Sequence, residues 1–301
     1  FVYLLIDVLG AVIWGVLFYG ANALLHFSFL DMTMSAVSIA FKLLVIFIVA
    51  YPFLWMVCTA FKPYKETITY PPTLLPSQWV LDGLKECLAE MDVRHFMKNS
   101  IVVSFSVLLL QYLVIIPAAY AFARVKFPGR SLLFGIVLLG FMIPQQVTFV
   151  PVYLIFSKAK MLQSYWPQIL PFIANAFGIF LLRQYFLQIP EEIIEAARMD
   201  NASEPKIIFS IMIPMAKTAL LTIGLLSFIS LWNSYFWPLI MTTKNTYRPL
   251  AVGVAMLKNV DSAIPWHMLM AGNLFLTCPI LIAYAFANKQ IRKAFVYSGI
   301  K

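Results

Sequence analysis

Ser100–Phe122, SIVVSFSVLLLQYLVIIPAAYAF, contains no charged side chain. A helix needs roughly 20 mostly apolar residues to cross a hydrocarbon core about 30 Å thick, so this stretch predicts a membrane-spanning helix. The whole chain agrees, because 62% of its 301 residues are hydrophobic and only 12% are charged. Soluble domains are about 25% charged. We therefore predict an all-α fold, a polytopic bundle of transmembrane helices, since a β-barrel would show short alternating strands instead.

Apolar runs of similar length flank this stretch on both sides. In chain order, the expected core spans are Val37–Cys58, Ser100–Phe122, Leu132–Phe156, Trp166–Leu187, Ile207–Trp232 and Trp266–Ala287. We expect the third of these to be kinked at Pro144 and Pro151, because proline removes a helix hydrogen bond. An additional run, Phe1–Leu25, is interrupted by Asp7 and would be an extra span or a fragment of one. The sequence thus predicts six core spans and a separate N-terminal segment at residues 1–30.

Basic residues gather in three of the segments between or after these runs. They are the Arg124–Arg130 turn, the Arg183–Lys206 loop and the Lys289–Lys301 tail. Lysine and arginine are enriched in the cytoplasmic loops of membrane proteins, and an even number of spans separates these three segments. We therefore expect all three, including the C-terminus, to lie on the cytoplasmic side of a plasma or inner membrane. The same rule accounts for the net charge of +9 without a nucleic-acid partner.

Acidic residues are concentrated in one of these segments, at Pro190–Pro205, PEEIIEAARMDNASEP. Five of the 13 acidic residues of the chain fall here, namely Glu191, Glu192, Glu195, Asp200 and Glu204. Two interpretations are open for such a segment. It can be an ordinary solvated loop at the membrane interface, or a polar surface on which another protein docks.

The first half of this segment has the pattern of a short helix. Pro190 suits a helix start, because its missing N–H would be unpaired there anyway. Glu191 and Glu192 would then lie in the first turn, where the helix dipole favours negative charge. Glu195 and Arg198 are three residues apart and can pair on the helix surface.

The second half has the pattern of a corner followed by another helix. The first helix should end near Asp200 and Asn201, because asparagine enters the left-handed conformation more readily than most residues. Either Asp200 or Ser203 can cap the next helix, with Pro205 in its first turn. We therefore expect a tight corner that leads directly into the next membrane span.

The order of residues in this segment resembles the EAA motif of permeases from binding-protein-dependent ABC importers. In that motif, Glu-Ala-Ala is followed by three residues of any type and then by Gly. About nine residues after the Gly comes Ile-x-Leu-Pro. Here Glu195–Ala197 leads to Asn201 in the glycine position, and Ile211–Pro214 ends the motif. Further stretches are similar to the carbohydrate-uptake branch, as in the second permease of a maltose-type or glycerol-3-phosphate-type pair: Pro52–Lys62, Tyr120–Pro128 and Leu231–Ile240.

The resemblance implies that residues 31–301 form an ABC importer transmembrane domain with a coupling helix near 191–205. In that family the coupling helix fits a cleft in a cytosolic ATPase subunit. By resemblance, the contact would be made by Glu191, Glu195, Ala196, Ala197, Asp200, Asn201 and Ala202. The implied partners are a second homologous permease, two ATPase subunits and an extracellular or periplasmic solute-binding protein. ATP and Mg²⁺ would bind to the ATPase partners, so no cofactor is expected in this chain. The Ile207–Trp232 span would pass the motion to the gate.

A sugar pathway through the membrane would use aromatic and amide side chains, because rings stack on sugar faces and amides bind hydroxyls. The candidates are Trp232, Asn233, Tyr235, Trp237 and Asn175. Tryptophan and tyrosine near the end of a span also form the ordinary interfacial belt of membrane helices, so both interpretations are open. The scattered cysteines and histidines show no metal-ligand spacing.

Several motifs are absent from the sequence. It contains no G-x-x-x-x-G-K-[ST] phosphate loop, so the chain is not itself the ATPase. It also lacks H-E-x-x-H and G-x-S-x-G, and we expect no enzymatic activity. Ion-coupled carriers keep ionisable groups deep in the membrane, and the predicted spans contain almost none. The expected function is the permease subunit of an ABC importer for a sugar, an oligosaccharide or a sugar-like polyol phosphate. An ABC permease for a non-sugar solute and an ion-coupled secondary transporter are the alternatives.

Overall fold

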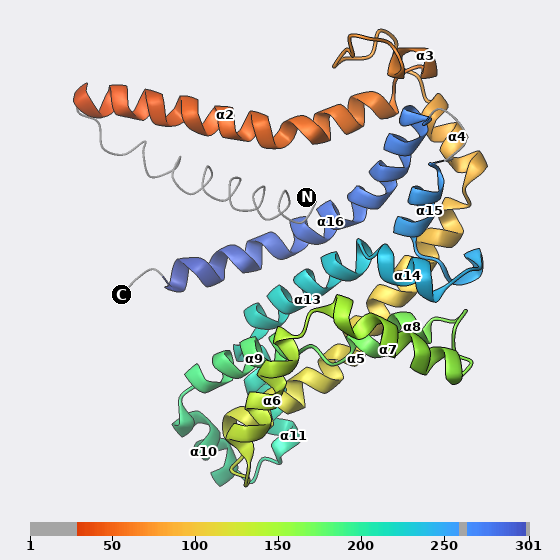
Figure 1. The fold of residues 1–301 in the computed structure, drawn as a ribbon. Coiled ribbons are helices and arrows are strands. Elements are labelled where there is room, and N and C mark those ends of the chain that lie inside the picture. The colour runs from red at the N-terminus through yellow and green to blue at the C-terminus, as the bar shows by residue number, and fades with distance from the viewer. Residues whose placement is uncertain (1–28, 259–263, 299–301) are drawn as a thin grey trace. The chain divides into compact units, whose positions relative to one another are not determined.

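The computed structural model describes residues 29–258 and 264–298, and the elements within these ranges are all helices (Figure 1). The additional run Phe1–Leu25 lies outside the described residues. Four of the described helices are long and apolar enough to cross a membrane, and the number rises to six if each of two bent helix pairs is one span. This agrees with the six expected core spans.

Of the described residues, 29–87 and 264–274 form the first of two compact units, and its main element is α2, Phe29–Ala60. From Ser38 onward, α2 is long and apolar enough to cross a membrane. Large apolar side chains are exposed along it, among them Phe41, Leu43, Phe47 and Ile48. Exposed apolar side chains along a helix of this length fit a lipid environment.

The loop that surrounds α3 (Tyr64–Thr67) is held by two charged side chains. The Lys62 ammonium donates to the carbonyl and the hydroxyl of Thr73. The Glu66 carboxylate accepts from the Ser77 amide at 3.1 Å and from its hydroxyl at 2.8 Å. Burial alone would raise the pKa of Glu66, but the hydrogen bonds from Ser77 and Thr73 lower it below its ordinary value. The loop is thus ordered by a carboxylate that must stay ionised.

The start of α4 (Asp82–Glu90) approaches the end of α2 very closely at Gly83. A Cβ atom there would lie 2.8 Å from the carbonyl oxygens of both Ala60 and His267, so only glycine fits. One turn later, Glu86 Oε2 lies 2.7 Å from His267 Nε2. Backbone contact and this polar pair therefore hold the start of α4 within the first unit.

The second compact unit consists, among the described residues, of 88–258 and 275–298, and α5, Val93–Arg124, runs through it. The Asp92 carboxylate accepts the His95 backbone N–H at 3.0 Å, so the helix starts before the expected boundary at Ser100. Its buried face includes Val103, Val107, Gln111, Ile115 and Ala119. An apolar stripe at four-residue spacing lies exposed on it at Ile101, Phe105, Leu109 and Leu113. The stripe follows one face of the helix, as expected for contact with lipid or another membrane helix.

The span after α5 is broken at a proline. Helices α6 (Arg130–Met142) and α7 (Gln145–Lys158) meet at an angle of 96° on either side of Pro144, so the kink expected there is confirmed as a full break. Pro151, by contrast, lies inside α7, which continues past it. The following candidate span runs from Trp166 to Gln188. It is built from α8 (Trp166–Ile169), η1 (Leu170–Phe172) and α9 (Ala176–Gln188).

The span after the acid-rich segment, expected at Ile207–Trp232, is bent. After α10 (Glu191–Met199), the chain forms α11 (Glu204–Ile207), the π-helix η2 (Ile208–Met212), α12 (Ile213–Met215) and α13 (Lys217–Trp232). The parts before and after Ala216 meet at 79°. Pro214 explains the interruption, because it has no N–H to continue the helix ladder.

Four elements complete the described chain: α14 (Phe236–Met241), η3 (Asn245–Tyr247), α15 (Leu250–Met256) and α16 (Trp266–Ser298). The core of the second unit lies where α5 meets α9 and α13. The Tyr112 hydroxyl donates to the Leu220 carbonyl at 2.7 Å, and Gly178 packs against Ile115 and Ile223. Small residues and interhelical hydrogen bonds are the interactions that associate helices in lipid.

Candidate functional site

The acid-rich segment forms α10, Glu191–Met199, a nine-residue helix that begins directly after Pro190. Pro190 has φ −55° and ψ 137°, so it stands just outside the helix, as the sequence indicated. Glu191 and Glu192 occupy the first turn. Acidic groups at this end of a helix contribute about 0.3–1 kcal/mol each through the helix dipole.

One face of α10 packs on the bundle and the other is exposed. Ile194 is only 1% exposed, and Ala197, one turn later, packs against the same apolar cluster. The exposed residues of the helix are Glu191, Glu192, Ile193, Glu195, Ala196, Arg198 and Met199. Among its apolar residues, Met199 is 83% exposed and Ile193 is 39% exposed. An apolar side chain at the tip of an acidic helix is a natural anchor for a protein partner.

The corner after α10 is made by Asn201, which has the left-handed φ of 55°. Its backbone N–H donates to the Arg198 carbonyl at 2.9 Å, and that of Asp200 donates to the Ala196 carbonyl at 3.0 Å. The expectation that asparagine replaces glycine at this corner is therefore confirmed. Pro205 lies in the first turn of α11, as expected. Ser203 occupies the N-cap position, but its side chain makes no capping hydrogen bond, so the expected cap is not formed.

The seven residues expected to meet an ATPase lie together on α10 and its corner, but not all of them are equally accessible. Glu191, Glu195, Ala196, Asp200 and Asn201 are exposed. Ala197 and Ala202 are partly buried against the bundle. The accessible edge therefore consists of carboxylates, one alanine and the corner, with Met199 beside them.

Arg198 pairs across the corner rather than along its own helix. We expected Glu195 as its partner, but the guanidinium lies 3.1 Å from Glu204 at the start of α11. This hydrogen bond to Glu204 raises the pKa of Arg198. The Tyr120 hydroxyl of α5 donates to the other oxygen of the same carboxylate. Turning the chain through the left-handed residue places Glu204 closer to Arg198 than a simple helix would.

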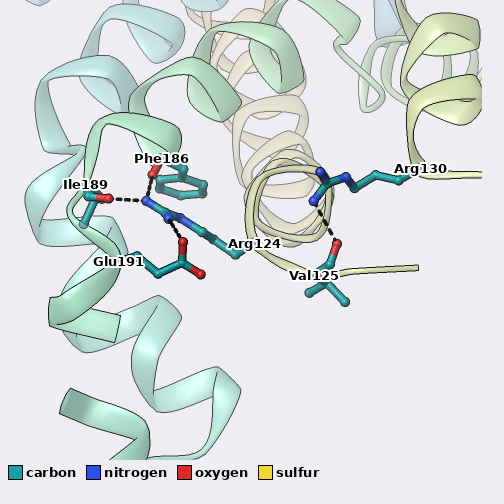
Figure 2. A network of polar contacts seen from close by, with 6 residues as sticks. All are labelled: Arg124, Val125, Arg130, Phe186, Ile189 and Glu191. Atoms are coloured by element: carbon teal, nitrogen blue, oxygen red, sulfur yellow. Dashed lines mark hydrogen bonds and ion pairs between the residues drawn. The ribbon is translucent and has the colours of Figure 1, made fainter. Parts of the chain in front are cut away.

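A second cation, Arg124, holds the other end of α10 (Figure 2). Its guanidinium donates to the carbonyls of Phe186, at 2.6 Å, and Ile189, at the C-terminal end of α9. It also lies 4.0 Å from Glu191, and the Arg124 side chain is only 8% exposed. Carbonyls at the end of a helix have no partner within the helix, so a buried cation satisfies them and complements the helix dipole.

Two of the pathway candidates, both tryptophans, are turned into the fold. Trp232 is 1% exposed, and its indole N–H donates to the Leu276 carbonyl at 2.9 Å. Trp237 is also buried, and its N–H donates to the Pro167 carbonyl at 2.7 Å. Both donors are therefore occupied by backbone carbonyls in this conformation.

The other three pathway candidates have different surroundings. Asn175 caps α9 by accepting the Gly178 N–H at 2.9 Å, and its amide nitrogen lies 3.3 Å from the Ser227 hydroxyl. Asn233 has a buried amide nitrogen without a hydrogen-bond partner. Tyr235 is 43% exposed. Among the described residues, no group of three or more His, Cys, Asp or Glu side chains could hold a metal ion.

The family model for binding-protein-dependent transport system inner membrane components matches residues 113–294, which include α10 and its corner. The chain belongs to this family. It is a family of transport permeases rather than of enzymes. The EAA resemblance read from Glu195–Ala197 is thus confirmed at the level of the family.

Individual relatives agree with this assignment over most of their length. This chain is 30% identical over 258 residues to the arabinooligosaccharides transport system permease protein of Halalkalibacterium halodurans, and the match covers 85% of this chain and 92% of that protein. It is 27% identical over 259 residues to the sn-glycerol-3-phosphate transport system permease protein of Brucella abortus, covering 83% and 92%.

The fold of the permease is also that of a solved transporter chain. The crystal structure of a bacterial ABC transporter involved in the import of the acidic polysaccharide alginate matches with a TM-score of 0.79. The sequence identity is 23%, and the match covers 88% of the permease and 98% of that chain. The helical architecture described above is therefore one that an ABC transporter adopts.

Sequence reasoning missed three residues that build the site, namely Tyr120, Arg124 and Met199. From the sequence, Tyr120 is only part of the Ser100–Phe122 span and of the Tyr120–Pro128 resemblance, and Arg124 is only part of a basic turn. Their positions at the end of an apolar span, one helical turn apart, are a signal that could have indicated contacts to a neighbouring helix end. Met199 gave no such signal, because its exposure depends on the direction in which α10 leaves the bundle.

Proposed function

We propose that this permease is the membrane subunit of an ABC importer, and that α10 is the helix through which ATPase subunits act on it. The exposed acidic edge of α10 carries the proposal. Its inner face, at Ile194 and Ala197, is packed on the bundle, so a force on the outer edge moves the spans rather than a loose loop. A loop that was merely solvated would need neither the buried anchor nor the fixed corner.

The proposed docking surface consists of Glu191, Glu195, Ala196, Met199, Asp200 and Asn201. It offers the apolar Met199 side chain at the C-terminal end of α10, beside exposed carboxylates. Interfaces typically combine apolar contacts with a polar rim. We therefore expect the ATPase to present an apolar cleft bordered by lysine or arginine side chains.

Two further points concern the arrangement of the importer. The basic segments Arg124–Arg130 and Arg183–Lys206 support a cytoplasmic position for α10, and an even number of spans then places the C-terminus on the same side. A second permease would pair with this chain, each permease would contact one ATPase subunit, and a solute-binding protein would deliver the substrate from outside. ATP and Mg²⁺ would bind to the ATPase subunits.

For the substrate, we propose a sugar or an oligosaccharide, with a polyol phosphate as the second candidate. The named relatives transport arabinooligosaccharides and sn-glycerol-3-phosphate, which are both hydroxyl-rich solutes. Asn233 and Tyr235 are the pathway candidates with a free polar atom or an exposed ring. Uptake of radiolabelled oligosaccharides and of glycerol 3-phosphate by the reconstituted importer distinguishes the two substrate classes.

The decisive experiment is affinity purification of the tagged permease in mild detergent after co-expression with its neighbouring genes. We expect an ATPase, a second permease and, with substrate present, a binding protein. Glu195→Lys should release the ATPase, because it places a cation where the rim of the cleft is basic. Glu90→Lys is the matched control, since Glu90 is an exposed acid on α4. Recovery of the permease alone, or ion-driven uptake by the isolated chain, would contradict the proposal.

A further inference from the structure

Both ends of α10 are held by one turn of a single helix. Tyr120 and Arg124 lie four residues apart on α5 and therefore on the same face. Arg124 binds the chain just before α10, at the carbonyls of Phe186 and Ile189 (Figure 2). Tyr120 binds the chain just after α10, at the Glu204 carboxylate. A displacement of α10 must therefore either carry the last turn of α5 with it or break these bonds.

The two contacts are joined through Phe186. The Tyr120 and Phe186 rings pack edge to face with their centroids 6.5 Å apart, and the Phe186 carbonyl is the one that Arg124 binds. Both rings are buried. Arg198 adds a second ligand to the Glu204 carboxylate at 3.1 Å, which ties the last turn of α10 to the Tyr120 contact. The end of α5, the end of α9 and both ends of α10 thus form one polar cluster with an aromatic centre.

The opposite end of α5 holds the loop that contains η3 and α15. The Asn99 amide donates to the carbonyls of Thr246, at 3.0 Å, and Arg248, at 2.9 Å. The Ser100 hydroxyl accepts the Leu250 N–H at 2.8 Å. Asn99 and Ser100 are buried, so these bonds are shielded from water. The first turns of α5 are therefore bound to this loop by three hydrogen bonds, just as its last turn is bound at both ends of α10.

Between these two ends, α5 is one continuous helix. Its 32 residues correspond to a length of about 48 Å at 1.5 Å per residue. The span that directly follows α10 is a poorer mechanical connection, because it contains the π-helix η2 and bends by 79°. A bend of this kind absorbs displacement, whereas α5 continues past its internal proline, Pro117, as one helix and passes displacement on.

We propose that α5 transmits the displacement of α10 to the η3–α15 loop, and that Tyr120 and Arg124 are the positioning residues that connect the two helices. This inference rests on the proposed function of α10. It assigns to α5 a role that sequence reasoning gave only to the Ile207–Trp232 span. Neither side chain needs to touch the ATPase or the substrate for this role.

The test uses the complete importer in proteoliposomes and measures solute uptake, ATP hydrolysis and the amount of ATPase retained. Arg124→Gln removes the cation, and Tyr120→Phe removes only the hydroxyl and keeps the ring contact with Phe186. Arg130→Gln is the matched control, because the Arg130 guanidinium donates to the Val125 carbonyl of its own turn (Figure 2). Arg124→Lys keeps the charge but not the forked geometry that reaches two carbonyls at once.

We expect Arg124→Gln to retain the ATPase and to hydrolyse ATP, while uptake per ATP falls by about tenfold, since a charge-assisted contact is lost. Tyr120→Phe should lower the same ratio less, and Arg124→Lys should restore part of it. A poorly folded variant lowers uptake and hydrolysis together and leaves their ratio unchanged.

Equal ratios of uptake to ATP hydrolysis for Arg124→Gln and Arg130→Gln would overturn the inference. So would loss of the ATPase from Arg124→Gln, because Arg124 would then build the docking surface. Absence of ATPase from the unsubstituted importer would instead contradict the proposed function.

Discussion

The backbone N–H of Ala202 lies 3.0 Å from the carbonyl oxygen of Ala197, and this bond closes the end of α10. Together with the bond from the Asn201 N–H to the Arg198 carbonyl, it forms a Schellman motif. In this motif the residue just after the helix, here Asn201, adopts the left-handed conformation. The two alanines also pack against the same apolar cluster. Backbone geometry thus sets the direction of the corner, and the Asp200 and Asn201 side chains are left at the surface.

Substitutions at Asn201 test this corner. Asn201→Gly should raise the free energy of unfolding by up to about 1 kcal/mol, because glycine adopts a left-handed φ without a steric cost. Asn201→Val should lower it by more than about 1 kcal/mol, since a β-branched side chain is disfavoured at this φ. Thermal unfolding of the purified permease in detergent measures both. A valine variant that melts together with the unsubstituted permease would show that the corner carries no such constraint.

Asn175 is predicted to stabilise α9 through its cap. Asn175→Ala should cost about 1 kcal/mol of stability, because the Gly178 N–H loses its acceptor. Asn175→Ser should recover most of that loss. Melting temperatures and the uptake KM of the reconstituted importer are measured side by side. If Asn175→Ser melts normally but changes KM, then Asn175 acts in the substrate pathway as well.

The close approach at Gly83 predicts opposite effects for two glycine substitutions. Gly83→Ala should destabilise the permease by about 1–3 kcal/mol, since the new methyl group meets two backbone carbonyls at 2.8 Å. Gly135→Ala in α6 meets nothing within 4 Å. It should therefore stabilise the helix by roughly 0.5–1 kcal/mol. Thermal unfolding of the two variants in one detergent provides the comparison. If Gly83→Ala melts together with the unsubstituted permease, then α2 and α4 are farther apart than the 2.8 Å contacts indicate.

Glu66 predicts a pH dependence of the loop around α3. Its pKa in the folded protein lies below the ordinary value of 4.5, so the ionised carboxylate is the stabilising form. The contribution is complete above pH 4.5 and is lost as the pH falls through the folded pKa. The site is largely solvated, so we expect less than about 1 kcal/mol. The difference in melting temperature between the unsubstituted permease and Glu66→Gln should shrink as the pH is lowered below 4.5. A constant difference would contradict this assignment.

The sequence predicts the number of spans well because the dominant physical constraint is length in lipid. An apolar run either reaches across the hydrocarbon core or does not, and the runs around Ser100 and Trp166 are unambiguous. The kink at Pro144 is predicted because the missing N–H of proline acts locally. The size of the bend at Ala216 is not predicted, because a proline inside an apolar run can be accommodated by a kink, a π-turn or a complete change of direction.

The site is predicted in outline and missed in its connections. The corner at Asn201 follows from the conformational preference of one residue type. The predicted partner of Arg198, Glu195, is wrong. The three-residue spacing applies to a continuous helix, but the chain turns after Arg198 and brings Glu204 to it. Arg124 was read as a marker of the cytoplasmic side, and its contact with the end of α9 depends on two elements 62 residues apart in sequence. Patterns within one segment do not contain such contacts.

The π-helix Ile208–Met212 has a consequence for which changes of chain length the permease tolerates. One residue added to or removed from a helix turns every later side chain by about 100° around the axis. Ala219 and Ile223, which are buried on α13, would then point away from their neighbours. A single-residue insertion or deletion in this turn should therefore be more harmful than most substitutions there. The number of residues between the corner and α13 is therefore a quantity that any working variant must keep.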